Sequence, residues 1–142
     1  MKKIAIILLS LCLVAGCDLF PKSNPFVGTW IGHGELTQQN TPGAGQTQVT
    51  TIDDIIEFRT DMTFSIRQGF RQTVNGAITA SLFQVGTGKY SYSDTTITMT
   101  FDATSDPGLN NDTPAYSFST DRKTCTIQPT SLTFPLILDK AG

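Results

Sequence analysis

Charged residues are scarce in this chain of 142 residues. Asp, Glu, Lys and Arg together make up 15% of it, against about 25% in an average soluble domain. No stretch clusters Lys or Arg, and the acidic residues outnumber the basic ones by 12 to 10. A surface without a basic patch repels the phosphate backbone of DNA and RNA. We therefore expect no nucleic-acid partner. The hydrophobic fraction of 39% is enough for one folded domain.

Histidine and cysteine are also rare, and this limits the chemistry that the chain can carry out. His33 has Glu35 beside it, whereas a zinc site needs three or four ligands. Asp and Asn residues between 102 and 112 do not follow the spacing of an EF-hand. The sequence has no Gly-x-Ser-x-Gly motif, phosphate loop or dinucleotide fingerprint. We expect no metal, no cofactor and no enzymatic activity.

The densest acidic group is Asp53, Asp54 and Glu57. On a strand, Asp53 and Glu57 share one face and Asp54 lies on the other. A glycosidase needs two carboxylates about 5 to 9.5 Å apart on either side of a sugar, and no further motif supports such a site. We interpret the group as the solvated face of a strand.

The chain has no apolar run long enough to span a bilayer comfortably. Its longest run covers only residues 4–16, whereas a transmembrane helix needs about 20 apolar residues. Lys2 and Lys3 precede this run and small residues end it, which is the pattern of a secretory signal peptide. We expect residues 1–16 to be removed, which leaves 8 basic residues against 12 acidic ones. The alternative is an uncleaved helix that packs against the domain.

Val14-Ala15-Gly16-Cys17 resembles the lipobox of bacterial lipoproteins. The resemblance implies that Cys17 is acylated with chains such as palmitate and becomes the first residue of the exported protein. Residues 17–25 then form a tether between the lipid and the domain. Each methylene buried in the bilayer contributes about 0.8 kcal/mol, so several acyl chains anchor a soluble domain. The expected location is the bacterial cell envelope, at the inner or outer membrane and outside the cytoplasm.

Cys125 is the one cysteine left in the expected domain, so the domain has no internal disulfide. It alternates with Thr124 and Thr126, which predicts a buried position in a strand.

Residues 26–142 show the two-residue periodicity of β-strands, interrupted by turn-forming residues. Asn75-Gly76 is the clearest signal for a hairpin, because a type I′ turn needs positive φ at both positions. Residues 37–48 are predicted to form a flexible loop or an exposed hairpin end, and residues 102–114 are a predicted loop. The predicted fold is all-β, a small antiparallel up-and-down barrel of eight or nine strands, with a β-sandwich as the alternative. The predicted strands are 26–36, 49–59, 63–70, 77–85, 89–93, 97–103, 115–119, 125–128 and 131–138.

The phrase "NPFVGTW" resembles the Gly-x-Trp signature that opens lipocalins and related calycin-type barrels, here Gly28 and Trp30. "IEFRTDMTFSI" and "GKYSYSDTTITMTF" resemble the repeated hairpins of that family. The resemblance implies a barrel that binds a small apolar or amphipathic molecule, with Trp30 as a plug at its bottom. No arginine follows in the last strand to stack on Trp30, and Lys140 is the nearest cation. The predicted strands are short, so a barrel filled by its own side chains is an alternative.

Side chains on the inward face of the strands are the candidates for contact with a ligand. A buried tyrosine hydroxyl needs a hydrogen-bond partner, which a ligand could supply. A second function class is a surface or periplasmic scaffold that contacts a protein partner through loops 37–48 and 102–114. The candidate ligand residues are Phe64, Tyr90, Tyr92, Met99 and Tyr116.

Overall fold

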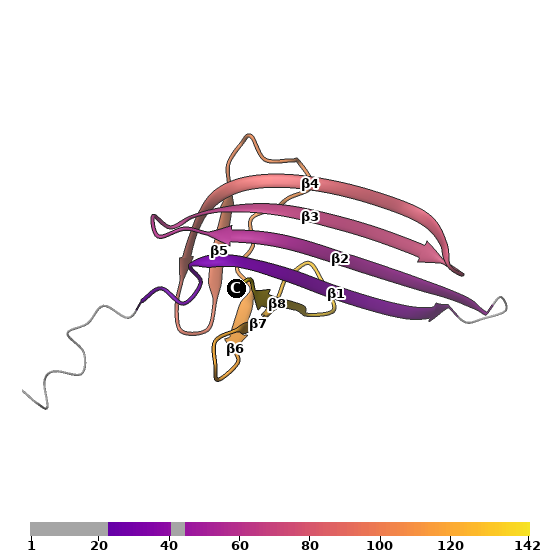
Figure 1. Cartoon of the computed structure of the whole chain (residues 1–142). Coiled ribbons are helices and arrows are strands. Elements are labelled where there is room, and N and C mark those ends of the chain that lie inside the picture. Colours follow the sequence, from indigo (N-terminus) through magenta and orange to yellow (C-terminus); the bar gives the residue numbers. More distant parts are fainter. Residues whose placement is uncertain (1–22, 41–44) are drawn as a thin grey trace, which may run out of the picture.

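The computed structural model describes residues 23–40 and 45–142. Neighbouring strands run antiparallel in the order β5-β4-β3-β2-β1-β8-β7-β6, as Figure 1 shows. No helix in these two ranges is long and apolar enough to cross a bilayer. The strands are β1 (Gly28–Asn40), β2 (Gln46–Phe58), β3 (Thr63–Val74), β4 (Ala77–Tyr92), β5 (Ile97–Phe101), β6 (Ala115–Phe118), β7 (Thr124–Gln128) and β8 (Leu136–Lys140).

Two bridges join β5 to the residues at the start of β6 and bring the sheet round into a barrel. Thr96 pairs with Ala115, and Met99 pairs with Asp112. The Met99 amide donates to the Asp112 carbonyl at 2.8 Å, and the Asp112 amide donates back at 3.1 Å. These two bridges close the barrel. Because they form a shorter seam than the ladders between the other strands, the closure is nearly but not fully complete. The structure confirms the all-β up-and-down barrel, which has eight strands, and not the sandwich.

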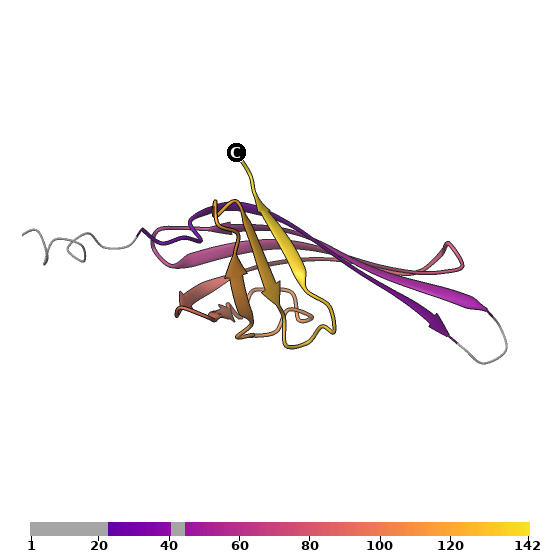
Figure 2. The same cartoon turned by 90° about the horizontal axis from the view of Figure 1, so that it is seen from below.

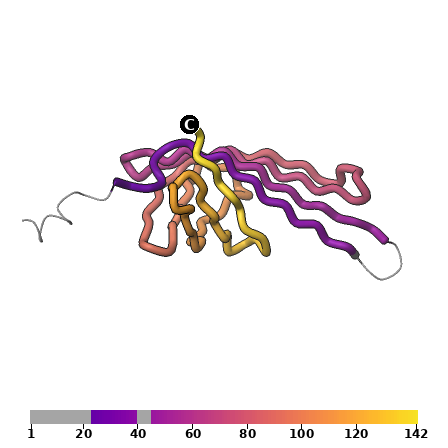
Figure 3. The backbone as a smooth tube through the Cα atoms, turned by 60° about the horizontal axis from the view of Figure 1, so that its bottom comes forward, coloured from indigo at the N-terminus to yellow at the C-terminus, as the bar shows by residue number. Residues whose placement is uncertain are grey.

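The first four strands are much longer than the barrel needs. Of the described residues of β1, only Trp30–His33 pair with β8. Likewise, only Gly88–Tyr92 of β4 pair with β5. β1 to β4 therefore continue past the barrel as a protruding four-stranded sheet (Figures 1, 2 and 3). Strands of 12 to 16 residues here contradict the expectation of short strands. We call this sheet the extension; it comprises residues 34–40, 46–52, 70–74 and 77–82.

The described part of segment 37–48 forms an exposed hairpin end, which is one of its two predicted alternatives, and not a flexible loop. Thr37–Asn40 and Gln46–Gln48 pair in register, with Gln38 opposite Gln48. These residues are polar because both faces of the extension are accessible here, so the usual alternation of a half-buried strand is missing. Residues 41–44 lie outside the described part of the chain.

Two of the predicted strands form one. Residues 77–85 and 89–93 belong to β4, because Gly86 and Gly88 continue the strand and face the barrel interior. Asn75 and Gly76 have φ of 51° and 81°, which confirms the predicted hairpin turn before β4. The last predicted strand, 131–138, begins only at Leu136.

Aromatic side chains fill the end of the barrel away from the extension. Phe26, Trp30, Phe58 and Phe64 are at most 1% exposed. Phe26 precedes β1 and lies inside the barrel, where the Trp30 indole Nε1 donates to its carbonyl at 2.6 Å. We call these four residues and Tyr90 the aromatic core. It closes this end of the barrel to ligands.

Gly88 lies on the inner face of β4, opposite Phe101 of the neighbouring strand β5, where there is no room for a side chain. A methyl group there would meet the Thr100 carbonyl and would lie 2.8 Å from Phe64 Cε1. Because the carbonyl belongs to the backbone of β5, we expect Gly88→Ala to lower the free energy of unfolding by about 3 kcal/mol. Urea denaturation measures this change.

Gly69→Ala is the matched control, since the nearest atom to its new methyl group is the Asp53 carbonyl oxygen at 3.7 Å. We expect it to change stability by less than about 0.5 kcal/mol. Equal effects of the two substitutions would show that β5 does not pack against β4 in this way.

Candidate functional site

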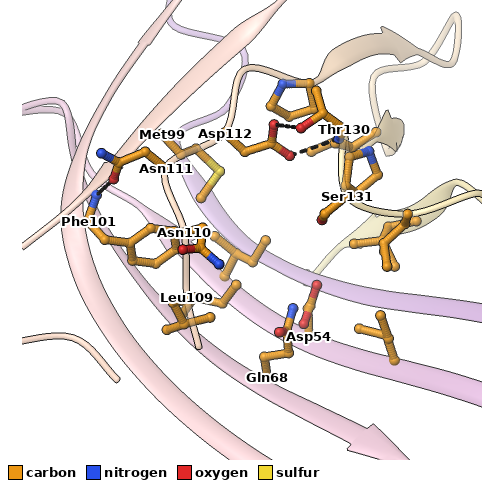
Figure 4. Close-up of a pocket in the computed structure, with 18 of the residues that line it drawn as sticks. Asp54, Gln68, Met99, Phe101, Leu109, Asn110, Asn111, Asp112, Thr130 and Ser131 are labelled. Atoms are coloured by element: carbon orange, nitrogen blue, oxygen red, sulfur yellow. Dashed lines mark hydrogen bonds between the residues drawn. The ribbon is translucent and has the colours of Figure 1, made fainter. Parts of the chain in front are cut away.

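A cavity of about 230 Å³ occupies the other half of the barrel, at the end from which the extension projects. Its walls come from β2, β3, β5, β7 and β8, and two loops, 102–114 and 129–135, lie across it (Figure 4). Most of the lining is aliphatic or aromatic. The apolar lining residues are Ile52, Ile56, Ile66, Met99, Phe101, Leu109, Pro114, Ile127, Pro129, Leu132, Leu136 and Leu138.

Asp54 is the exception on the wall of β2. Its residue is 2% exposed, and its carboxylate Oδ1 has no hydrogen-bond partner among the described residues. Figure 4 shows Asp54 beside Gln68 of β3. Burial away from water disfavours the charged form and raises the pKa of Asp54 from 3.8 to about 6, against a smaller opposing effect of the Gln68 side chain.

The register of the sheet explains why Asp54 and Gln68 meet. Asp54 of β2 lies opposite Gln68 of β3, which lies opposite Gln84 of β4. All three side chains face the barrel interior, in a row between apolar residues. Gln84 is 8% exposed and packs against the Gly108 backbone. The row therefore places polar groups at one level of an otherwise apolar interior.

Asp112 is the second carboxylate in the lining, and its oxygens are occupied. Its Oδ2 accepts from the Thr130 amide at 3.0 Å, and its Oδ1 accepts from the Thr113 amide and from the Thr130 hydroxyl. Asp112 thus ties together the two loops over the cavity. Among the described residues, the lining contains no Lys, Arg or His that would neutralise Asp54.

Of the five candidate ligand residues, Met99 alone lines the cavity. Phe64 and Tyr90 belong to the aromatic core and do not line the cavity. The Tyr90 hydroxyl donates to the Arg59 carbonyl at 2.9 Å and accepts from the Asn24 side chain at 2.7 Å. A ligand is therefore not needed to satisfy it.

Tyr92 and Tyr116 line a separate surface hollow of about 540 Å³ beside the N-terminal segment. The Tyr116 hydroxyl donates to the Ser93 carbonyl at 2.6 Å. Tyr92 is 36% exposed. Neither faces the cavity.

The two signature residues lie at the closed end of the barrel. Trp30 is fully buried and does not line the cavity. Lys140 Nζ lies 5.4 Å from the centre of the Trp30 ring, within reach of a cation–π interaction. Gly28 has φ of 130°, which L side chains rarely adopt.

The acidic group of β2 divides between the two faces of the sheet. Asp53 lies outside, where His33 Nδ1 is 2.7 Å from its Oδ1, and Glu57 is also exposed. The interpretation of the whole group as solvated was wrong for Asp54. Its position could have been read from the alternation Ile52, Asp54, Ile56.

Cys125 is buried in β7, and burial raises the pKa of its thiol to about 12. Such a thiol is a poor nucleophile. Among the described residues no three His, Cys, Asp or Glu side chains are placed to hold a metal ion. Asp102 and Asp106 instead accept hydrogen bonds from Thr87 and Val85 along the edge of β4.

No protein-family model matches the chain, and no curated protein sequence matches it. The assignment of function therefore depends on the cavity itself.

Burial of Asp54 has a measurable effect on stability. Because its pKa is higher in the folded than in the unfolded protein, the folded state binds more protons between pH 3.8 and about 6. The contribution of Asp54 to the free energy of unfolding falls as the pH rises through that window, by about 3 kcal/mol in total. We expect Asp54→Asn to lack this fall.

Urea denaturation of both proteins between about pH 4 and pH 8 isolates the effect, because other groups titrate equally in each. Asp53→Asn, on the outer surface, controls for the loss of one negative charge. A difference between wild type and Asp54→Asn that stays constant over this range would contradict the burial of Asp54.

Proposed function

We propose that this protein binds a small amphipathic molecule in the cavity of its barrel. The observation that carries the proposal is the buried carboxylate oxygen of Asp54 in an apolar cavity. Binding sites for small molecules combine apolar walls with a few polar groups that fix orientation. This cavity has both.

The size of the cavity limits the ligand. An apolar protein cavity of about 150 Å³ holds benzene, which has six heavy atoms. In proportion, 230 Å³ suits a molecule of about nine or ten heavy atoms. A long fatty acid or a retinoid exceeds this volume.

Methionine methyl groups provide a direct test. Met99 lines the cavity, whereas Met62 packs against the aromatic core at the opposite end. We expect indole, which is apolar with one N–H donor and has about nine heavy atoms, to shift the NMR signal of the Met99 methyl saturably. The Met62 signal should stay in place. Methyl-¹³C-methionine labelling gives both signals in one spectrum.

Leu109→Trp is the matched variant, because a larger side chain on the loop over the cavity competes for the same volume. It should weaken the response of Met99 to indole. A response of Met62 equal to that of Met99, or none from either, would contradict ligand binding in the cavity.

The same proposal places the barrel at a membrane. Its support is the sequence: the signal peptide 1–16, the lipobox ending in Cys17 and the polar tether. Cys17 and the signal peptide lie outside the described residues. Residues 23–25, the described end of this tether, lie at the closed end of the barrel, and the cavity lies at the other end. A lipid anchor at Cys17 would leave the mouth of the cavity accessible.

Cys17→Ser tests the anchor. In a bacterial host we expect the wild-type chain to incorporate radiolabelled palmitate and to sediment with membranes. The variant should lose the label and remain uncleaved, because the thioether needs a sulfur atom. Cys125→Ser, inside the barrel, controls for the other cysteine. Labelling of the Cys17→Ser chain would contradict the anchor.

A scaffold for protein interaction is the second candidate function, and the extension favours it. Ile78 and Leu82 are 65% and 52% exposed there. Beyond His33, β1 has no neighbouring strand among the described residues on its outer side. Such edges accept an extended segment of another chain. Loop 102–114, the other expected contact, instead closes the barrel and lines the cavity. An unresponsive Met99 would leave this function as the better account.

A further inference from the structure

The charge inside the cavity is unbalanced. Its lining residues include two carboxylates, Asp54 and Asp112, and no cationic side chain. Asp112 is satisfied by Thr113 and Thr130, but Oδ1 of Asp54 accepts no hydrogen bond within the described chain. A buried acceptor without a partner destabilises a protein by about 1–3 kcal/mol, and more when it is charged. A ligand that supplies a donor would offset this penalty.

The negative charge of the Asp54 carboxylate indicates which kind of hydrogen-bond donor a ligand would supply. A buried carboxylate is stabilised most by an opposite charge that also donates a hydrogen bond. An ammonium group supplies both, with three N–H donors on one compact centre. A carboxylate ligand would instead meet two acidic side chains and no cation. An alcohol would satisfy Oδ1 but would leave its charge uncompensated.

We propose that the ligand of this cavity is a primary amine with a compact apolar body, and that its ammonium group binds Asp54 inside the barrel. This inference rests on the proposed function, since it specifies the class of molecule that occupies the same cavity.

The arrangement of the walls fits such a molecule. Asp54 and Gln68 lie side by side on β2 and β3, so a second polar side chain adjoins the place of the ammonium group. Ile66 and Met99 provide apolar surface for the body of the ligand. Asn110 and Ser131, on the two loops, provide polar surface at the other side of the cavity, as Figure 4 shows.

Phenethylamine, phenethyl alcohol and phenylacetate share one aromatic body of suitable size and differ in the polar group. Isothermal titration calorimetry with the full exported chain measures the affinity of the protein for each of the three at about pH 7. We expect the amine to bind at least about tenfold more tightly than the alcohol, and phenylacetate to bind most weakly.

Two substitutions of adjacent residues separate the effect of Asp54 from that of net charge. Asp54→Asn should bind the amine and the alcohol with affinities within about twofold of each other, because the charge is gone. Asp53→Asn removes the same charge from the outer surface, where Asp53 faces His33. It should keep the preference for the amine.

The pH dependence in the wild-type protein gives a test that needs no variant. The neighbours of Asp54 on the adjacent strands are Gly32 of β1, Gln68 of β3 and Leu138 of β8, and none of these three side chains titrates. Asp112 is the one other titratable group in the lining. Since protons compete with the ammonium group for Asp54, the amine should bind about tenfold more weakly at about pH 5 than at about pH 7. The alcohol should change by less than about twofold.

The outcomes separate this inference from the proposed function. Binding of the alcohol or phenylacetate as tightly as the amine, or an amine preference that survives Asp54→Asn, would overturn the amine assignment and leave the cavity as a binding site. Absence of binding by all three probes and by indole would overturn both.

Discussion

Phe26 packs against five aromatic rings of the barrel, and the remainder of the structure depends on this packing. Its ring centre lies between 4.8 and 6.4 Å from those of Phe58, Tyr90, Tyr92, Tyr116 and Phe118. These rings come from β2, β4 and β6, so one side chain from the N-terminal segment joins strands on opposite sides of the barrel. Aromatic pairs of this kind contribute beyond the area they bury. They keep the barrel closed although the seam between β5 and β6 is short.

Aromatic residues fill one end of the barrel, whereas fewer buried side chains lie at the other end. The second cluster of buried residues contains only Ile52, Phe134 and Leu136, and the cavity lies between the two clusters. Asp54 faces this cavity. A carboxylate in such surroundings lowers the stability of the free protein, and a bound cation would restore it. The same residue thus accounts for a weakness of the empty barrel and for the specificity that we assign to it.

Part of this architecture follows from local sequence patterns. The Asn75-Gly76 turn and the alternating apolar residues of β2, β3 and β5 define hairpins by themselves. The length of β1 and β2 does not follow, because Thr and Gln residues of the extension are held by cross-strand pairing and not by a buried face. From the sequence, Gly86 and Gly88 predicted the end of a strand. In the barrel both glycines face inward, and the space beside them is filled by the side chains of Phe101, Leu109 and Phe64.

The site was harder to predict than the fold. Asp54 has the same parity as Ile52 and Ile56, which places it inside, but acidic residues are seldom buried without a partner. The loop residues that complete the cavity are brought there by the bridge between Met99 and Asp112, a contact that exists only once the barrel has closed. Tyrosines were expected at the ligand because of their hydroxyl groups, and two of these hydroxyls bind backbone carbonyls instead.

The specificity that we propose for the barrel depends on the binding of a cation by the Asp54 carboxylate. The most direct measurement is the titration of the Asp54 carboxyl carbon by ¹³C NMR, with and without saturating phenethylamine. We expect the pKa of Asp54 to be about 6 in the free protein and to fall by at least about one unit when the amine is bound, because the ammonium group favours the charged form. A pKa that does not change on addition of the amine would contradict this specificity.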